Sequence, residues 1–496
     1  MGSARAFLPE MKAHYGRLRH YIDGQWSVQE GGDVLPVLNP ATGREIAQVP
    51  LAGKDEVDAA VSAAREAFPH WRETPPAERG RRLLALRGLL LRDVEMLARI
   101  IVQDMGKTID EARGEVARAI ENVEVAAGIP SLMMGYGLED GAAAGIDEEV
   151  VVQPIGPFAA ITPFNFPVMV AFWFLPYAVA AGNTFIVKPS EQDPVVQDLV
   201  FRLIEEAEFP PGVVNLVHGA KDTAEALIDH PDVRGISFVG STPVARSIYA
   251  RAAAHGKRVQ CGGGAKNFLV VMPDAKLDAA VEAVIRSAYG CAGQRCLAGS
   301  VVLALDDIRE RFMAKFHRAA NDLRLGYGLD EATEMGPVIS DAARRRVVDH
   351  ITRGAEEGAR VLLDGRGAEV PDYPGSFVGP TILDDVAPDM KVAREEIFGP
   401  VVSVLEAKSI DEAIETINAS RYGNAASIFT QSGAAARAFR YSVQCGNIGI
   451  NVGVAAPMAY FPFGGQKDSF FGTLHGQGRD AIRFFSDHKV AITRWP

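Results

Sequence analysis

Cys296 is the side chain in this sequence that is best placed to act as a nucleophile. It lies between glycines, in the run Gly293-Gln-Arg-Cys-Leu-Ala-Gly299. An amphipathic stretch ends near Tyr289 and a β-branched run begins at Ser300, so Cys296 falls at a helix-to-strand junction. Flanking glycines let the backbone turn sharply and let a ligand come close, so this junction could present the thiol to a cleft. The alternative is that Cys296 is a small buried apolar residue, as most unpaired cysteines are.

The remaining cysteines give no sign of a metal site or of disulfide bonds. Cys261, Cys291 and Cys445 form no Cys-x-x-Cys spacing and have no paired histidines nearby. The sequence therefore predicts no zinc site and no disulfide framework, and it favours a reducing, cytoplasmic location. We interpret Cys261 and Cys291 as packing residues. Redox pairing of Cys291 with Cys296 is the unsupported alternative.

Asn165 is a polar side chain in an unusually apolar setting. It stands in Pro163-Phe-Asn-Phe-Pro167, inside a stretch from Val151 to Val187 that holds no charged residue. A buried amide needs hydrogen-bond partners. It could cap a turn, or it could donate to an oxyanion if a nucleophile lies nearby, and Cys296 is the candidate.

Two strand ends carry residues that suit a nucleotide. Phe238-Val-Gly-Ser-Thr-Pro243 joins a predicted strand to a helix whose first N–H groups could bind a phosphate. Lys188 and Glu191 follow another predicted strand, where open α/β sheets bind ligands. A plain helix cap and two ordinary surface charges are the competing explanations. The sequence has no Gly-x-Gly-x-x-Gly fingerprint at the first sheet and no phosphate-binding P-loop.

The elements that position these residues form two α/β units. A chain of 496 residues implies two or three domains. Helical periodicity covers 55–68 and 77–127. Short apolar strands then alternate with helices, and one uncharged helix is expected over 168–181. This alternation predicts a doubly wound parallel sheet covered on both faces, followed by a second α/β unit from Asn267 to about Gly465.

Two stretches of alternating strands belong to neither core and predict a small oligomerisation element. They lie over 136–153 and 488–495. We therefore expect residues 1–136 and 154–260 to form a nucleotide-binding domain and residues 261–466 a catalytic domain. Residues 137–153 and 467–496 form the oligomerisation element and C-terminal segment, so a homodimer or homotetramer is expected.

Composition narrows the possible partners. The net charge of −12 disfavours binding to nucleic acid or to an anionic membrane surface. No signal peptide is evident, and prolines at 154, 157, 163, 167 and 176 interrupt the uncharged stretch before it reaches the ~20 residues of a membrane span. The sequence predicts a protein that acts on a small molecule.

Taken together and in order, several motifs resemble those of the aldehyde dehydrogenase superfamily over nearly the whole chain. They are Pro163-Phe-Asn-Phe-Pro167, Lys188-Pro-Ser-Glu191, Phe238-Val-Gly-Ser-Thr242, Gly293-Gln-Arg-Cys296 and Glu395-Glu-Ile-Phe-Gly-Pro400. Within it the chain is most similar to the branch of methylmalonate-semialdehyde dehydrogenases, which transfer the acyl group to coenzyme A. The segments that carry this likeness are Glu111–Glu124, Pro130-Ser-Leu-Met-Met, Pro462–Ser469 and the terminal Arg494-Trp495.

The resemblance implies a role for each of these positions. Cys296 would be the nucleophile, and the Asn165 amide with the Cys296 backbone N–H would form an oxyanion hole. NAD would be the cofactor, with Glu396 on the nicotinamide ribose and Phe398 beside the ring. The residues that the resemblance assigns to NAD are Thr162, Phe164, Lys188, Ser190, Glu191, Gly240, Ser241, Glu396 and Phe398.

One departure from the hydrolytic members decides the expected chemistry. Those enzymes have a water-activating glutamate where this chain has Gly262, in Gln260-Cys-Gly-Gly-Gly-Ala-Lys266. The acylating branch also lacks it, so the resemblance implies a thioester on Cys296 that coenzyme A removes. Arg118 and Arg295 would bind a substrate carboxylate, although each could instead form a structural ion pair.

We therefore expect oxidation of methylmalonate or malonate semialdehyde to propionyl-CoA or acetyl-CoA, with loss of carbon dioxide. One alternative is a non-acylating aldehyde dehydrogenase that uses NAD or NADP on another aldehyde. Another, of a different class, is a cysteine hydrolase or acyltransferase that uses no nicotinamide. A structural protein on a borrowed fold would have lost catalytic positions, and only the base is missing here.

Overall fold

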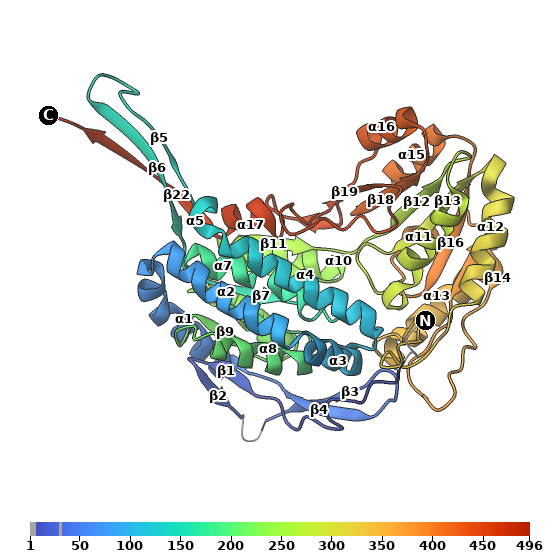
Figure 1. The fold of residues 1–496 in the computed structure, drawn as a ribbon, viewed down its shortest axis with the longest axis horizontal. Coiled ribbons are helices and arrows are strands. Elements are labelled where there is room, and N and C mark those ends of the chain that lie inside the picture. Colours follow the sequence, from blue (N-terminus) through green and yellow to red (C-terminus); the bar gives the residue numbers. More distant parts are fainter. Residues whose placement is uncertain (1–5, 29–31) are drawn as a thin grey trace.

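The computed structural model of the protein describes residues 6–28 and 32–496. Two α/β units lie side by side, and a long arm leaves the first unit near the C-terminus (Figure 1). In the described part of the chain no helix combines the length and apolarity needed to cross a bilayer.

The first unit is built on an eight-stranded sheet with a parallel centre. Its strands, in spatial order, are β2 Gln25–Ser27, β1 His20–Ile22, β9 Val214–Leu216, β8 Thr184–Lys188, β7 Pro157–Ile161, β10 Gly235–Val239, β11 Arg258–Gly262 and β21 Phe470–Phe471. The central run β9-β8-β7-β10-β11 is parallel and reverses its order between β7 and β10. This confirms the doubly wound sheet, and the reversal marks the edge at which such sheets bind ligands.

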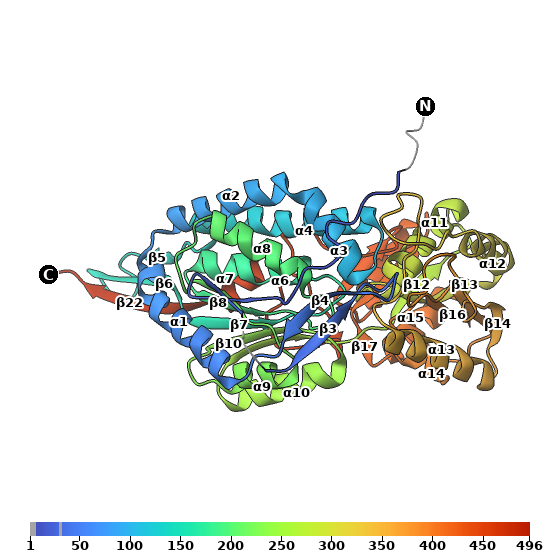
Figure 2. The same ribbon diagram turned by 90° about the horizontal axis from the view of Figure 1, so that it is seen from below.

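Side chains of the central strands pack alternately against two layers of helices. Phe158 and Ala160 of β7 face one apolar core, and Ala159 and Ile161 face the other. The two layers lie on opposite sides of the sheet (Figure 2). One contains α1 Lys54–Glu73, α9 Lys221–Asp229 and α10 Thr242–Ala254, and the other α2 Pro76–Arg92, α4 Ile109–Ala127, α7 Leu175–Ala181 and α8 Val195–Glu206.

The second unit has a seven-stranded sheet that is parallel except at one edge. Its strands, in spatial order, are β14 Arg360–Leu363, β15 Thr381–Asp384, β16 Val401–Ala407, β13 Gly299–Leu305, β12 Asn267–Val271, β18 Ala425–Phe429 and β19 Asn447–Ile450. Its helices are α11 Leu277–Tyr289, α12 Asp306–Asn321, α13 Asp341–Glu356, α14 Lys391–Arg394, α15 Ile410–Ala419 and α16 Gly433–Ser442. Cys296 lies between α11 and β13, at the junction that the sequence predicts.

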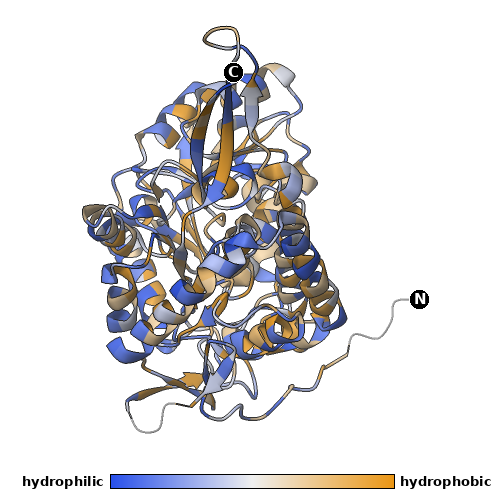
Figure 3. Ribbon diagram, turned by 90° about the vertical axis from the view of Figure 1, so that its left-hand side faces the viewer, coloured by the Kyte–Doolittle hydropathy of each residue, from blue (hydrophilic) through white to orange (hydrophobic). Residues whose placement is uncertain are grey.

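The arm is a three-stranded sheet with apolar side chains in contact with solvent. It is formed by β5 Tyr136–Leu138, β6 Ile146–Pro154 and β22 Ser486–Arg494. Polar and apolar stretches lie side by side along it near the C-terminus (Figure 3). Tyr136, Leu138 and Ile492 are 74%, 65% and 69% exposed. In the C-terminal part of the expected oligomerisation element, only residues 486–494 lie in the arm. Strand β20 Gln466–Lys467 pairs with β17 Tyr422–Gly423 instead, and β21 joins the first sheet.

The remaining elements are short or lie at the edges of the first unit. They are the hairpin of β3 Val34–Leu38 and β4 Glu45–Pro50, and the helices α3 Val94–Met105, α5 Ile129–Leu132, α6 Met169–Phe172 and α17 Gly478–Phe484. The expected domain boundary at residues 260 and 261 falls inside β11.

Two stretches that were predicted to be continuous helices are each divided into separate helices. The helical pattern over 77–127 is three helices, because Gly106 ends α3 in a left-handed conformation with φ 94° and Thr108 caps the start of α4. The single helix expected over 168–181 is two, α6 and α7. Pro176 lacks an N–H and its ring would clash with the Phe172 carbonyl in a continuous helix.

Candidate active site

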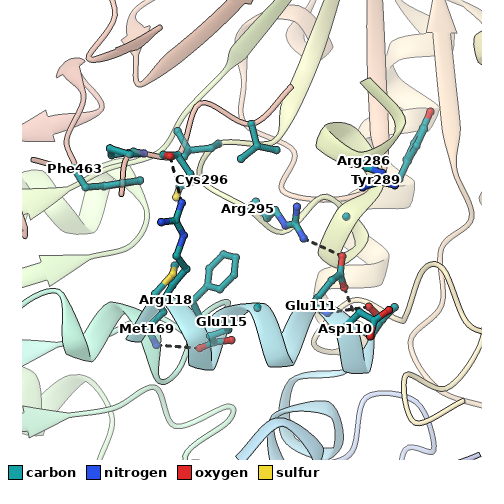
Figure 4. A pocket seen from close by; sticks show the side chains of 18 of the residues that line it. Asp110, Glu111, Glu115, Arg118, Met169, Arg286, Tyr289, Arg295, Cys296 and Phe463 are labelled. Carbon is teal, nitrogen blue, oxygen red and sulfur yellow. Dashed lines mark hydrogen bonds and ion pairs between the residues drawn. The ribbon is translucent and has the colours of Figure 1, made fainter. Parts of the chain in front are cut away.

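Two clefts meet at Cys296. The first has a volume of about 750 Å³ and lies between α4, α11 and the segment 454–463 (Figure 4). The second has a volume of about 840 Å³ and lies at the carboxyl ends of β7, β8 and β10. Cys296 is on the wall of both, so a group bound in either cleft can reach its thiol.

A strained turn carries the chain from α11 to Cys296. Cys291, Ala292 and Gly293 all have positive φ, at 50°, 52° and 72°. Only glycine fits at 293, because a Cβ there would stand 2.1 Å from the Gly399 carbonyl oxygen. Glu111 of α4 accepts a hydrogen bond from the Cys291 N–H at 2.7 Å. Helix α4 therefore holds the turn that leads to Cys296.

Hydrogen bonds also fix the main chain of Cys296 itself. Its carbonyl oxygen accepts from the Nδ2 atoms of Asn267, at 2.9 Å, and Asn424, at 2.6 Å. Both asparagines stand at the starts of strands in the second sheet, so the sheet holds the Cys296 backbone. Burial, followed by the charge of Glu396, raises the pKa of the Cys296 thiol to about 12, while its own N–H, Arg295 and the Leu297 N–H act in the opposite direction.

Asn165 lies next to the loop that carries Cys296. It is buried, at 4% exposure, and lines the second cleft together with Cys296. Its Nδ2 atom donates to the carbonyl oxygen of Gln294 at 3.0 Å, two residues before Cys296. This hydrogen bond uses one of the two N–H groups that an amide nitrogen carries. The structure thus brings the Asn165 amide to the nucleophile's own loop.

The residues expected to bind a dinucleotide all line the second cleft. They are Thr162, Phe164, Lys188, Ser190, Glu191, Gly240, Ser241, Glu396 and Phe398. The buried Lys188 ammonium forms an ion pair with Glu191, Nζ to Oε2, at 3.0 Å. Burial lowers the pKa of Lys188. Lys188 and Glu191 therefore pair with each other, and they also line the cleft where a nucleotide could bind.

The start of α10 suits a phosphate. Ser241 is the N-cap residue, yet no side chain caps this helix, so side chains leave its first N–H groups unused. Gly240, just before this helix, lines the second cleft, and the packing requires glycine there because a Cβ would lie 2.5 Å from the Phe238 ring. A cleft of this size, with a helix N-terminus at one end and a Lys–Glu pair at another, fits a dinucleotide such as NAD.

Glu396 and Lys266 are two charged groups beside the glycine-rich segment 262–264. Glu396 is half-buried and lines the second cleft, whereas Lys266 is buried. Glu396 Oε1 accepts a hydrogen bond from the Ala265 N–H at 3.0 Å. Burial raises the pKa of Glu396 to about 7. Burial also lowers the pKa of Lys266 to about 7. In this arrangement Glu396 contacts the glycine-rich segment, because a Cβ on Gly264 would stand 2.5 Å from its Oε2 atom.

The reactivity of Cys296 should depend on pH in a defined direction. Because the pKa of its thiol is raised to about 12 and the thiolate is the reactive form, alkylation by iodoacetamide should quicken about tenfold per pH unit. No plateau should appear between about pH 6 and about pH 9. Above about pH 7, where Glu396 is ionised, Glu396→Gln removes a charge that raises the pKa of Cys296, so it should speed alkylation there.

The rate is followed by mass spectrometry of the Cys296 peptide in enzyme without NAD or aldehyde. Cys296→Ala supplies the background for this measurement. A plateau near pH 8, or slower alkylation in Glu396→Gln, would contradict the expected electrostatics.

The position of the absent glutamate is open space. A Cβ on Gly262 would come no closer than 3.4 Å to Val239, which is an ordinary contact. Beside it lies a hollow of about 30 Å³ that also touches Cys296, Gly263 and Gln260. None of its described lining residues is acidic. This side of Cys296 therefore offers room without a carboxylate base.

Arg118 and Arg295 lie on the wall of the first cleft with Cys296 (Figure 4). Each also has an acidic partner. Arg295 Nη2 lies 3.0 Å from Glu111 Oε1, and Arg118 Nη1 lies 2.6 Å from Glu121 Oε2. The structural ion pairs left open by the sequence are thus present, and the guanidinium groups nonetheless face the cleft.

The sequence interpretation overlooked several residues that organise the site. Asn267 and Asn424 could have been noticed as amides at the edges of apolar strand runs, where they need partners. Thr108 and Glu111 form a capping box, a signature that is visible in the sequence. The buried pair of Lys107 and Glu115 has no comparable local signal.

A cysteine between a dinucleotide-type cleft and a second small-molecule cleft, beside two α/β sheets, suits an oxidoreductase that uses a dinucleotide. The chain belongs to the aldehyde dehydrogenase family, whose model matches residues 26–491. It is an oxidoreductase, and the resemblance deduced from its motifs is confirmed.

Within this family the chain is similar to malonate-semialdehyde dehydrogenases. It is 48% identical over 478 residues to malonate-semialdehyde dehydrogenase 2 of Geobacillus kaustophilus, covering 96% of this chain and 99% of that one. It is 46% identical to malonate-semialdehyde dehydrogenase of Halalkalibacterium halodurans, covering 97% and 98%.

Two solved structures are similar throughout. One is a methylmalonate-semialdehyde dehydrogenase from Oceanimonas doudoroffii, with a TM-score of 0.95, 42% identity and coverage of 97% and 99%. The other, from Sinorhizobium meliloti 1021, is complexed with NAD and has a TM-score of 0.95, 42% identity and coverage of 97% and 98%.

Proposed function

We propose that this enzyme oxidises malonate or methylmalonate semialdehyde with NAD and releases acetyl-CoA or propionyl-CoA and carbon dioxide. The observation that carries the proposal is the place of Cys296 on the shared wall of two clefts. One cleft bears the arginines and the other fits a dinucleotide, and the hollow beside Gly262 and Cys296 has no acidic residue in its described lining. The names of the relatives support the substrate class.

In the first step the Cys296 thiolate adds to the aldehyde carbon and forms a carbon–sulfur bond. The carbonyl oxygen takes up the negative charge. The Asn165 amide and the Cys296 backbone N–H are the donors placed to stabilise it. Collapse of this adduct restores the carbonyl, and the carbon loses hydride and becomes a thioester on Sγ.

NAD would be held by Lys188, Glu191, Gly240, Ser241 and Glu396 and would supply the acceptor for that hydride. The substrate carboxylate lies β to the new thioester carbonyl, so its carbon–carbon bond can break to release carbon dioxide, with a proton taking its place. The thiol of coenzyme A then attacks the thioester, forms acyl-CoA and returns the Cys296 thiolate. Without a base at Gly262, water competes poorly for the same carbonyl.

The arginines should control selectivity for an aldehyde that has its own carboxylate. We expect Arg295→Met to lower kcat/KM for malonate semialdehyde about tenfold to a hundredfold relative to kcat/KM for propanal, because propanal lacks the carboxylate. The ratio removes any effect on the thiol itself. Arg286→Met is the control, since Arg286 lines the same cleft but is paired with Glu282 at 2.8 Å and exposed. An unchanged ratio in Arg295→Met would rule out this role.

A substrate panel with product analysis tests the proposal. Semialdehydes with a carboxylate and their uncharged analogues are assayed with and without coenzyme A, and the products are identified by mass spectrometry. The proposal requires acyl-CoA and carbon dioxide from the carboxylated substrates. A free carboxylic acid at the same rate in both conditions would instead identify a hydrolytic dehydrogenase.

We further propose that the arm joins copies of this chain into a homodimer or homotetramer. The exposed apolar side chains of β5 and β22 support this assembly, which light scattering of the purified protein would measure. A location in the reducing cytoplasm rests on the cysteine pattern alone and stays a prediction.

A further inference from the structure

Lys107 and Glu115 form a fully buried ion pair at the base of the first cleft, which Glu115 lines, next to the loop that carries Asn165. Both side chains are 0% exposed, and Lys107 Nζ lies 2.6 Å from Glu115 Oε2. Lys107 stands between Gly106, which ends α3, and Thr108, which caps α4, so a tight interhelix turn fixes its backbone. Taking two charges out of water is costly, and such pairs are weak sources of stability.

The pair forms hydrogen bonds with both a carbonyl group and N–H groups of the loop that carries Asn165. Lys107 Nζ donates to the carbonyl oxygen of Asn165 at 2.7 Å and lies 3.9 Å from the centre of the Phe166 ring. Glu115 Oε1 accepts from the N–H groups of Val168, at 2.8 Å, and Met169, at 3.1 Å. One charge therefore holds the carbonyl of Asn165, and the other holds the N–H groups that follow it.

The Asn165 side chain in turn contacts the loop that carries Cys296. With its main chain held by Lys107, Asn165 directs its amide at the carbonyl oxygen of Gln294, 3.0 Å away. Gln294 is fully buried and its own Oε1 accepts from the Ile339 N–H at 3.0 Å, so this partner is also immobile. A small shift of the loop would move the amide away from the place where an oxyanion forms.

Helix α4 forms hydrogen bonds with both the loop that leads to Cys296 and the loop that carries Asn165. Glu111 accepts from the N–H of Cys291 in the nucleophile loop, and Glu115, one turn later, accepts from the N–H groups of the Asn165 loop (Figure 4). We propose that Lys107 and Glu115 are positioning residues that set the Asn165 amide for oxyanion stabilisation. This inference rests on the proposed role of Asn165 and is independent of coenzyme A and of the aldehyde's identity.

A double-mutant cycle tests it through the NADH burst at saturating aldehyde without coenzyme A. Lys107→Met with Glu115→Leu removes both charges at once and so leaves no unpaired buried ion. We expect its burst rate constant to fall about tenfold to a hundredfold, with NAD affinity and the aldehyde KM changed less than about twofold. In an Asn165→Ala background the same change should cost less than about twofold, because the group being positioned is already absent.

The control pair is Arg309 and Asp384, which is largely buried at 2.6 Å and lines neither cleft. Arg309→Met should leave the burst unchanged. If the charge-removing variant does not fold, Glu115→Gln, which keeps an acceptor for Val168 and Met169, replaces it in the cycle with an expected loss of about threefold to tenfold.

Equal losses in both backgrounds would show a general structural effect and overturn the inference alone. A full burst rate in Asn165→Ala would overturn the oxyanion role of Asn165 and the inference with it. Both outcomes leave the proposed substrate class and acyl transfer intact, and the second also removes Asn165 from the proposed mechanism.

Discussion

Cys296→Ala should lower NADH formation by at least about 10⁴-fold, because the reaction has no other way to make the thioester from which hydride leaves. The replacement removes one sulfur atom from the wall of two open clefts and creates no large buried cavity, so the variant should remain folded. NAD affinity, measured by calorimetry, should stay within about twofold, since the residues that line the rest of the second cleft are unchanged.

Cys445→Ala is the matched control. Cys445 is also a free cysteine, but it is buried and lines neither cleft. It should retain full activity. NADH formation by Cys296→Ala at more than a small fraction of the normal rate would remove Cys296 from the reaction.

Gly262→Glu should convert part of the turnover from acyl transfer to hydrolysis. The new carboxylate would enter the hollow beside Cys296, where a Cβ makes only ordinary contacts. A general base placed there could activate water against the thioester. We expect steady-state NADH formation without coenzyme A to rise about a hundredfold, at the lower end of what a positioned base contributes.

Gly262→Gln separates the base from its bulk. The glutamine has nearly the same shape and fills the same hollow but cannot accept the proton from water. It should leave the rate without coenzyme A unchanged. An equal rise in both variants would mean that shape, rather than the missing carboxylate, limits hydrolysis.

The sheets could be predicted because their central strands are short, mostly apolar and buried. All five residues of β7 and of β8 are buried, which is typical of a parallel sheet covered on both faces. The positions of Lys188 and Gly240 followed from the same pattern, since each stands at the carboxyl end of its strand. Helix ends were less predictable, because Pro176 and Gly106 interrupt patterns whose apolar periodicity continues past them.

The catalytic residues themselves were accessible from short motifs, but their supports were not. Asn165 and Cys296 stand in local runs of glycine, proline and phenylalanine that mark unusual backbone. Glu115 instead lies in ordinary helical sequence and Lys107 in the turn before it, and both contact a loop more than fifty residues away. Only the packing of α4 and of this turn against that loop reveals them. The same is true of Arg295, whose pairing with Glu111 spans 184 positions.

The NADH burst without coenzyme A shows which nucleophile removes the acyl group from Cys296. Enzyme is mixed rapidly with NAD and malonate semialdehyde, and absorbance of NADH is followed to the end of the first turnover and beyond. The account predicts a burst of one NADH per Cys296, then near-silence until added coenzyme A restores turnover and acetyl-CoA accumulates. Continuous turnover at the full rate without coenzyme A would contradict it.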